Sequence, residues 1–182
     1  MRFREFVSDH ARPLSLDAGQ YVFRQGDTDR SLYMLKTGLL KAYYLSSNGK
    51  ENIKSFIGAG DLIGSLKGVY GEAGCSFSLV CLTACDLVAI DFDKVHQASQ
   101  TDLQLASDVN RFLIDFAMKK EGREFELLCL NAEERYQRLL DGAPHLLDSV
   151  TQNDIARYLG VTPVGLSRIK KRVERARAEG EV

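Results

Sequence analysis

The sequence predicts an α+β protein with an antiparallel β domain first, then a long helix, then a small all-helical domain. Up to about residue 91, short apolar runs are separated by glycine turns, which is typical of an antiparallel sandwich, roll or barrel. Beyond residue 91 the apolar residues recur at helical spacing. The last thirty-odd residues contain two consecutive helix starts with a glycine turn between them, which indicates a helix-turn-helix.

The β domain is predicted from six runs of strand-forming residues. Turn residues lie between the runs, and the glycines among them allow the chain to reverse within a few residues. The runs are 21–23, 32–35, 39–45, 52–57, 76–82 and 87–91. Because the connections are short, neighbouring strands are expected to be antiparallel.

Helices are expected at 92–99 and 103–130. The second helix carries an apolar stripe at i, i+4, i+7 and i+11, which suits packing on the β domain or pairing with the same helix of a second copy. The stripe consists of Leu105, Val109, Phe112 and Phe116. Polar residues 119–123 interrupt it, so a full coiled coil is not expected. A further helix starts at Asn131, with Glu134 in the capping-box position, and ends before Gly142 and Pro144.

Residues 151–179 fit a helix-turn-helix. Thr151 is the expected cap of the first helix, and Gly160 allows the tight turn that follows it. Thr162 caps the second helix and Pro163 occupies its first position, where a missing amide costs nothing. Three apolar residues of the second helix are expected to face the first: Leu166, Ile169 and Val173. The predicted division is therefore a β domain over 1–101, a connecting helix over 102–130 and a helix-turn-helix domain over 131–182.

Charge supports a nucleic-acid partner for the C-terminal part. From residue 151 onward seven basic side chains stand against four acidic ones, a net charge of +3, whereas the whole chain carries −1. Basic side chains at a C-terminus also complement a helix dipole, so charge alone does not distinguish DNA binding from this structural role. The capped helix pair together with the positive charge favours binding to DNA phosphates.

Composition excludes several other classes. With 45% hydrophobic and 27% charged residues, the chain can form a core and remain soluble. It has no apolar run of membrane-spanning length and no signal-peptide core at residues 1–10, so a cytoplasmic protein is expected. The four cysteines have neither zinc nor redox spacing and are expected to be buried thiols. No nucleophile–base pair or metal cluster stands out, so neither an enzyme nor a cofactor or metal is predicted.

Several strings in this order resemble the CRP/FNR superfamily of bacterial transcription regulators. They are DAGQYVFRQGD, SLYMLKTGLLKAYY, NGKE, GAGDLIGS, TACDLVAID and TQNDIARYLGVTPVGLSRIKK. The resemblance covers nearly the whole chain. It implies a β roll of the cyclic-nucleotide-binding type (a double-stranded β-helix), a connecting helix that dimerises, and a C-terminal helix-turn-helix that reads DNA.

The effector site implied by the resemblance departs from the family pattern. The cyclic-nucleotide-binding relatives place a glutamate on the ribose and an arginine on the phosphate. Here Ser65 stands in the glutamate's place, and the arginine's place falls at or next to Cys75. The candidate effector pocket is Gly64, Ser65, Leu66, Lys67, Cys75 and Ser76. We expect cAMP and cGMP not to act here, and the effector remains unknown. The alternative is a regulator gated by a small anion bound through Lys67 and nearby helix amides.

Other family features also differ. No cysteine precedes Cys75, so an iron–sulfur cluster of the family's N-terminal type is not expected, and isolated histidines do not favour haem. After the basic helix only 178–182 remain, so the β-hairpin wing of many relatives is expected to be absent or vestigial.

The predicted function is a homodimeric, sequence-specific transcription regulator that binds a roughly palindromic double-stranded DNA site. The expected DNA-binding residues are Thr151, Asn153, Thr162, Val164, Ser167, Arg168, Lys171 and Arg172. Arg168 is the leading base reader, because a guanidinium bridges guanine O6 and N7. RNA polymerase is a further expected partner, and no membrane is. A protein-interaction module without DNA binding is the alternative from another class.

Overall fold

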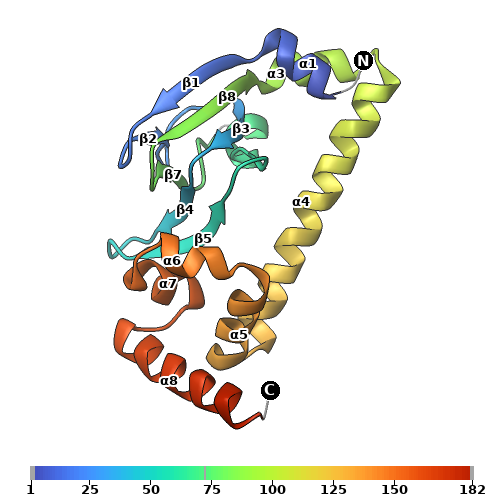
Figure 1. Cartoon of the computed structure of the whole chain (residues 1–182). Helices are drawn as coiled ribbons and strands as arrows, with labels where there is room; N and C mark the ends of the chain where they lie inside the picture. The colour runs from blue at the N-terminus through green and yellow to red at the C-terminus, as the bar shows by residue number, and fades with distance from the viewer. Residues whose placement is uncertain (1–2, 72, 181–182) are drawn as a thin grey trace. The chain divides into compact units, whose positions relative to one another are not determined.

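The computed structural model describes residues 3–71 and 73–180. The chain forms two compact units, unit 1 ending at Phe116 and unit 2 beginning at Ala117. The change from one unit to the other falls inside a single long helix, α4 (Leu103–Cys129), drawn in yellow-green to yellow in Figure 1. The three-part domain division remains a prediction. No helix in the described ranges is long and apolar enough to cross a membrane.

Unit 1 is built on two four-stranded antiparallel sheets (Figure 1). The strand order is β1-β8-β3-β6 in one sheet and β2-β7-β4-β5 in the other. The strands are β1 (Arg12–Leu16), β2 (Tyr21–Phe23), β3 (Ser31–Thr37), β4 (Leu40–Leu45), β5 (Glu51–Ile57), β6 (Leu62–Ile63), β7 (Ser78–Cys81) and β8 (Cys85–Asp91). The predicted antiparallel β fold and all six predicted strands are confirmed.

Two strands were not expected from the sequence. β1 contains Pro13, which cannot donate to a ladder, and it lies at the edge of its sheet, where proline is tolerated. β6 has only two residues and pairs with Tyr33 and Met34 of β3. Neither segment shows a period long enough to be recognised before its partner strand is known.

The core of unit 1 lies between the two sheets and includes three of the four cysteines. Cys75, Cys81 and Cys85 are buried there, as predicted, whereas Cys129 on α4 is exposed and the expectation of burial is wrong for it. Burial, together with the neighbouring Cys85 thiol, raises the pKa of Cys81 to about 12. That thiol therefore stays protonated and unreactive at neutral pH.

A second cluster joins α1 (Phe3–His10), α3 (Phe92–Ser99) and the start of α4. Leu105 is fully buried in it and Val109 packs against it. The apolar stripe of α4 therefore packs on unit 1 at its N-terminal end, which is one of its two predicted roles, and pairing with a second copy through Phe112 and Phe116 remains a prediction. Residues 92–99 form the predicted helix, whereas α1 was not predicted.

Unit 2 contains the end of α4, α5 (Ala132–Gly142), α6 (Pro144–Ser149), α7 (Gln152–Leu159) and α8 (Pro163–Glu179). Asn131 and Glu134 form the predicted capping box of α5. Pro144 was interpreted only as a stop signal, but it occupies the first position of α6, where proline is compatible with a helix. One apolar cluster from α5, α7 and α8 holds the unit together.

Candidate nucleic-acid interface and effector pocket

The start of each helix of the helix-turn-helix is fixed by a threonine. Thr151 Oγ1 accepts a hydrogen bond from the amide of Asp154 at 3.1 Å, and Thr162 Oγ1 accepts one from the amide of Gly165 at 3.1 Å. Between the helices Gly160 has φ +71°, a left-handed conformation that favours glycine. These local features confirm the predicted caps and turn.

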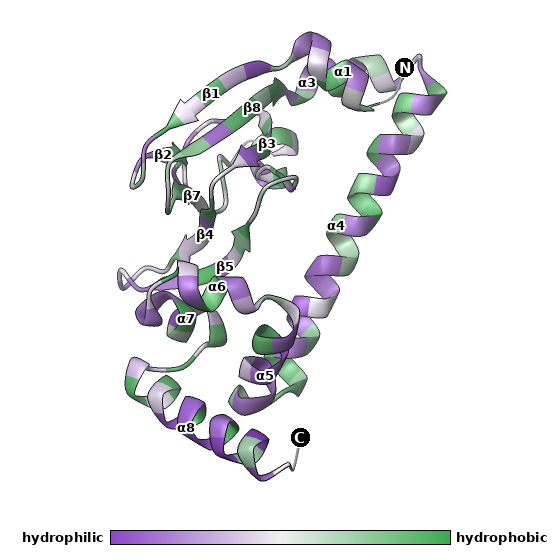
Figure 2. Cartoon of the chain, viewed as in Figure 1, coloured by the Kyte–Doolittle hydropathy of each residue, from purple (hydrophilic) through white to green (hydrophobic). Residues whose placement is uncertain are grey.

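Packing of α8 against α7 decides which face of α8 is exposed. Leu166, Ile169 and Val173 are buried, as their spacing predicted. The opposite face is exposed and carries four of the predicted DNA-binding residues: Val164, Ser167, Arg168 and Lys171. Val164 is 64% exposed and is therefore accessible to a ligand on this face. Figure 2 shows α8 as largely hydrophilic.

Lys170 of α8 donates to Gln152 and Arg175 pairs with Glu179, and the other basic side chains of α8 fall into two groups. Arg172 pairs with Glu133 at 2.5 Å and Arg177 with Asp141 at 2.5 Å, so these two hold α8 to α5. Arg168 and Lys171 make no hydrogen bond or ion pair with any residue in the described ranges. The outward face therefore keeps two positive charges available for a ligand.

The remaining predicted contacts lie at helix starts. Thr151, Asn153 and Thr162 are exposed. The two threonine oxygens already accept amide hydrogen bonds, but each hydroxyl proton is still able to be donated. Helix starts with exposed donors suit phosphate contacts.

In the candidate effector pocket, the Ser65 side chain is buried and forms hydrogen bonds within the protein. Its side chain is 2% exposed, and its Oγ accepts hydrogen bonds from the amides of Gly68 at 3.3 Å and Ser76 at 3.0 Å. It thereby caps α2 (Leu66–Tyr70) and ties it to the segment before β7. Two amides near this pocket are therefore already satisfied within the protein.

The place expected for the family's arginine is also filled by packing. Cys75 is 3% exposed, and burial raises the pKa of its thiol. A Cβ added to Gly68 would stand 2.6 Å from the Asp29 carbonyl oxygen and 3.1 Å from Cys75 Sγ. Leu66 and Ser76 are partly buried, Gly64 is buried, and Lys67 is exposed. The structure thus brings the predicted pocket residues together, but Ser65 and Cys75 serve the internal packing of unit 1.

The face of α4 opposite its buried stripe was not noticed in the sequence. It presents large apolar side chains at i, i+4, i+11 and i+14, which lie on one side of a helix. They are Ile114 (52% exposed), Met118 (65%), Phe125 (47%) and Leu128 (76%). Alternating hydrophobic and hydrophilic colours follow α4 in Figure 2. We name these four residues the α4 seam.

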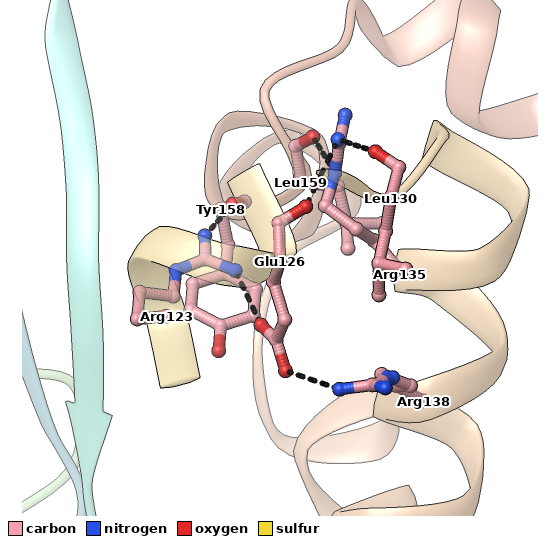
Figure 3. Close-up of polar contacts among 7 residues, drawn as sticks. All are labelled: Arg123, Glu126, Leu130, Arg135, Arg138, Tyr158 and Leu159. Atoms are coloured by element: carbon pink, nitrogen blue, oxygen red, sulfur yellow. Dashed lines mark hydrogen bonds and ion pairs between the residues drawn. The ribbon is translucent and has the colours of Figure 1, made fainter. Parts of the chain in front are cut away.

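A set of arginine contacts in unit 2 was also missed. Arg123 of α4 and Arg135 of α5 donate to backbone carbonyls at the end of α7, as Figure 3 shows. Their sequence positions carry no recognisable motif, because the acceptors are backbone atoms 24 and 35 residues away.

Comparison with known proteins agrees with this architecture. Residues 13–102 match the family model described as the cyclic nucleotide-binding domain. The chain is 27% identical to electron transport regulator A of Shewanella oneidensis, covering 91% of this chain and 70% of the relative. It is 27% identical to the fumarate and nitrate reduction regulatory protein of Vibrio cholerae, again covering 91% and 70%. The chain belongs to the CRP/FNR family.

Solved structures show the same fold. FixK2 from Bradyrhizobium japonicum superposes with a TM-score of 0.74 at 19% identity, covering 93% of this chain and 86% of that one. The regulator CLP of Xanthomonas campestris gives 0.70 at 20% identity, covering 97% and 91%. CRP/FNR proteins are transcription regulators and not enzymes, and members of the family bind DNA and act as dimers. This chain is a CRP/FNR-type transcription regulator.

Proposed function

We propose that this CRP/FNR protein is a homodimer that binds a roughly palindromic double-stranded DNA site through the outward face of α8. The observation that carries the proposal is the combination on one face of Val164, Ser167, Arg168 and Lys171, all exposed on a helix whose start is capped and whose opposite face is buried. A helix of this kind fits the major groove.

The exposed side chains have different roles in this proposal. Arg168 reads a guanine through O6 and N7, and Val164 contacts a thymine methyl. Ser167 contacts a base or a phosphate, while Thr151, Asn153 and Thr162 position the DNA backbone. Lys171 and Arg172 were predicted together as phosphate contacts. Lys171 is the better placed, since Arg172 would first have to leave its ion pair with Glu133.

The α4 seam supplies the dimer contact in this proposal. Four large apolar residues on one helical face are costly to leave in water, and a two-fold pair of α4 helices would cover them. Pairing then presents two α8 helices about one DNA turn, ~34 Å, apart. RNA polymerase is the proposed further partner, and the cytoplasm, where the DNA lies, is the proposed location.

We further propose that cAMP and cGMP are not effectors of this protein. A cyclic phosphate entering a partly buried site needs donors and an opposite charge. The Ser65 and Cys75 side chains carry no positive charge, and because they are only 2% and 3% exposed, neither presents a donor to an entering ligand. Lys67 lies on a helix of only five residues, so it offers a weak substitute.

Selection of DNA sites from a random pool tests the function. Wild type should enrich a palindromic site, and Arg168→Ala should bind that site more weakly by roughly 1–3 kcal/mol for each half-site and lose preference at one guanine in each half-site. Lys171→Ala should weaken all DNA about equally and reduce the salt slope by about 0.9 for each half-site, or about 1.8 for the dimer. Failure of wild type to enrich any sequence would favour the protein-interaction alternative. An unchanged preference in Arg168→Ala would remove Arg168 from base reading.

A further inference from the structure

The end of α4 and the end of α7 meet at Arg123 (Figure 3). Arg123 Nη1 lies 3.0 Å from Glu126 Oε2, and Nη2 donates to the carbonyl oxygen of Tyr158. The guanidinium carbon lies 3.8 Å from the centre of the Tyr158 ring, which is a cation–π contact. One side chain of α4 thus holds both the backbone and the ring of the residue two places before Gly160.

Arg135 makes a second connection at the same place. Its Nε donates to Leu159 O at 3.1 Å, and its Nη1 donates to Glu126 O at 3.5 Å and to Leu130 O. The last carbonyls of a helix have no partner within the helix and carry the negative end of its dipole. The positively charged Arg135 side chain therefore donates hydrogen bonds to backbone carbonyls at the C-terminal ends of both α4 and α7.

The side chains of Arg123 and Glu126 are largely buried where they meet. The Arg123 side chain is 16% exposed and that of Glu126 is 25% exposed. Arg123 Nε is buried and has no hydrogen-bond partner within the described ranges. A buried unpaired donor costs free energy, and the contacts of Arg123 with Glu126 and Tyr158 must offset that cost. The planar guanidinium of Arg123 donates its hydrogen bonds in fixed directions, whereas a lysine ammonium does not.

The contacts lie between the two surfaces that the proposed function uses. On α4, Met118 precedes Arg123 and Phe125 and Leu128 follow it, and α8 follows Tyr158 and Leu159 after a short turn. A change in the angle between α4 and α7 would therefore move α8 relative to the seam. In a dimer this changes the separation of the two recognition helices.

We propose that Arg123 and Arg135 are positioning residues that lock the helix-turn-helix to the last turns of α4 and so set the half-site spacing that the dimer accepts. This inference rests on the proposed function. The arginines touch no DNA in it. They act by fixing the direction in which α8 is presented.

The test compares Arg123→Lys and Arg135→Lys with Arg138→Lys in the full-length protein. Arg138 is the matched control, because it shares Glu126 at 3.9 Å but is 55% exposed and donates to neither α7 carbonyl, and Arg138→Lys keeps the positive charge beside the Phe125 ring of the seam. Binding is measured on operators whose half-sites are moved by one or two base pairs, and on a single half-site. Circular dichroism melting reports whether each variant is folded.

Wild type and Arg138→Lys should prefer one spacing. Arg123→Lys and Arg135→Lys should lose about tenfold or more on that spacing, because the second half-site no longer engages in register, while single half-site affinity changes by less than about twofold. Variants that melt like wild type and retain its spacing preference would overturn the inference. An equal loss on the single half-site would also overturn it, since that result indicates only a damaged fold.

Hydrogen exchange separates failure of the inference from failure of the proposed function. If wild type binds no DNA, the proposed function fails. The contacts of Arg123 and Arg135 with the end of α7 can still be tested, because they should protect the amides in 124–130 and 155–160 from exchange. Both segments should lose protection together in Arg123→Lys and Arg135→Lys and keep it in Arg138→Lys. Unchanged protection in the two variants would refute the lock whatever the DNA result.

Discussion

Ser65→Ala should destabilise unit 1 by about 2–4 kcal/mol, although it removes a single oxygen. The hydroxyl is 2% exposed and accepts from the amides of Gly68 and Ser76. Loss of a helix cap costs about 1 kcal/mol. Leaving a second buried amide without an acceptor adds roughly 1–3 kcal/mol. For a unit of this size the melting temperature should fall by roughly 8–16 °C.

Thermal unfolding followed by circular dichroism checks this value, with Ser76→Ala as the control. That change keeps the backbone amide of residue 76 and removes a partly buried hydroxyl that makes no hydrogen bond within the described ranges, so it should cost under about 1 kcal/mol. A Ser65→Ala protein that melts with wild type would refute the reasoning, since it would show that water or another group satisfies the two amides.

The same melt tests whether the pocket accepts a cyclic nucleotide. At 1 mM, a ligand with micromolar affinity would stabilise wild type by about 4 kcal/mol, whereas one with millimolar affinity adds about 0.4 kcal/mol. We expect a rise of under about 2 °C with cAMP or cGMP. A rise of ten degrees would show that another group replaces the missing anchors.

Three further outcomes are expected. Gly160→Ala should cost unit 2 roughly 1–2 kcal/mol in chemical denaturation, because φ is +71° and nothing lies within 4 Å of a new Cβ to add a clash; a cost near zero would place the turn in another conformation. Met118→Glu should convert a dimer into monomers in sedimentation at micromolar concentration. Phe112→Glu should chiefly lower the stability of the fold, because Phe112 is half-buried. The reverse pattern would show that the predicted stripe, and not the α4 seam, makes the dimer contact. A thiol reagent should modify Cys129 first and leave Cys81 unmodified in the folded protein, because only the former is exposed; early loss of the Cys81 thiol would contradict its burial.

The helix-turn-helix was predictable from the sequence because its signals are local. Thr151, Gly160, Thr162 and Pro163 act within one or two turns of backbone, so their positions alone predict where the helices start and stop. The buried triplet of α8 follows from helical spacing, and with it the exposed face. Strand-forming runs separated by turns likewise predicted the antiparallel β domain.

Long-range contacts could not be predicted from the sequence in the same way. The two faces of α4 are both apolar in sequence, and only packing on unit 1 decides that Leu105 is buried while the side carrying Met118 stays exposed. The role of Ser65 depends on the amide of Ser76, eleven residues away and on another element. Arg123 and Arg135 bind backbone carbonyls, which leave no trace in residue identity. The sequence by itself determined most of the elements and the exposed face of α8, whereas the tertiary structure decided which surfaces are already occupied, because that depends on which distant segments come into contact.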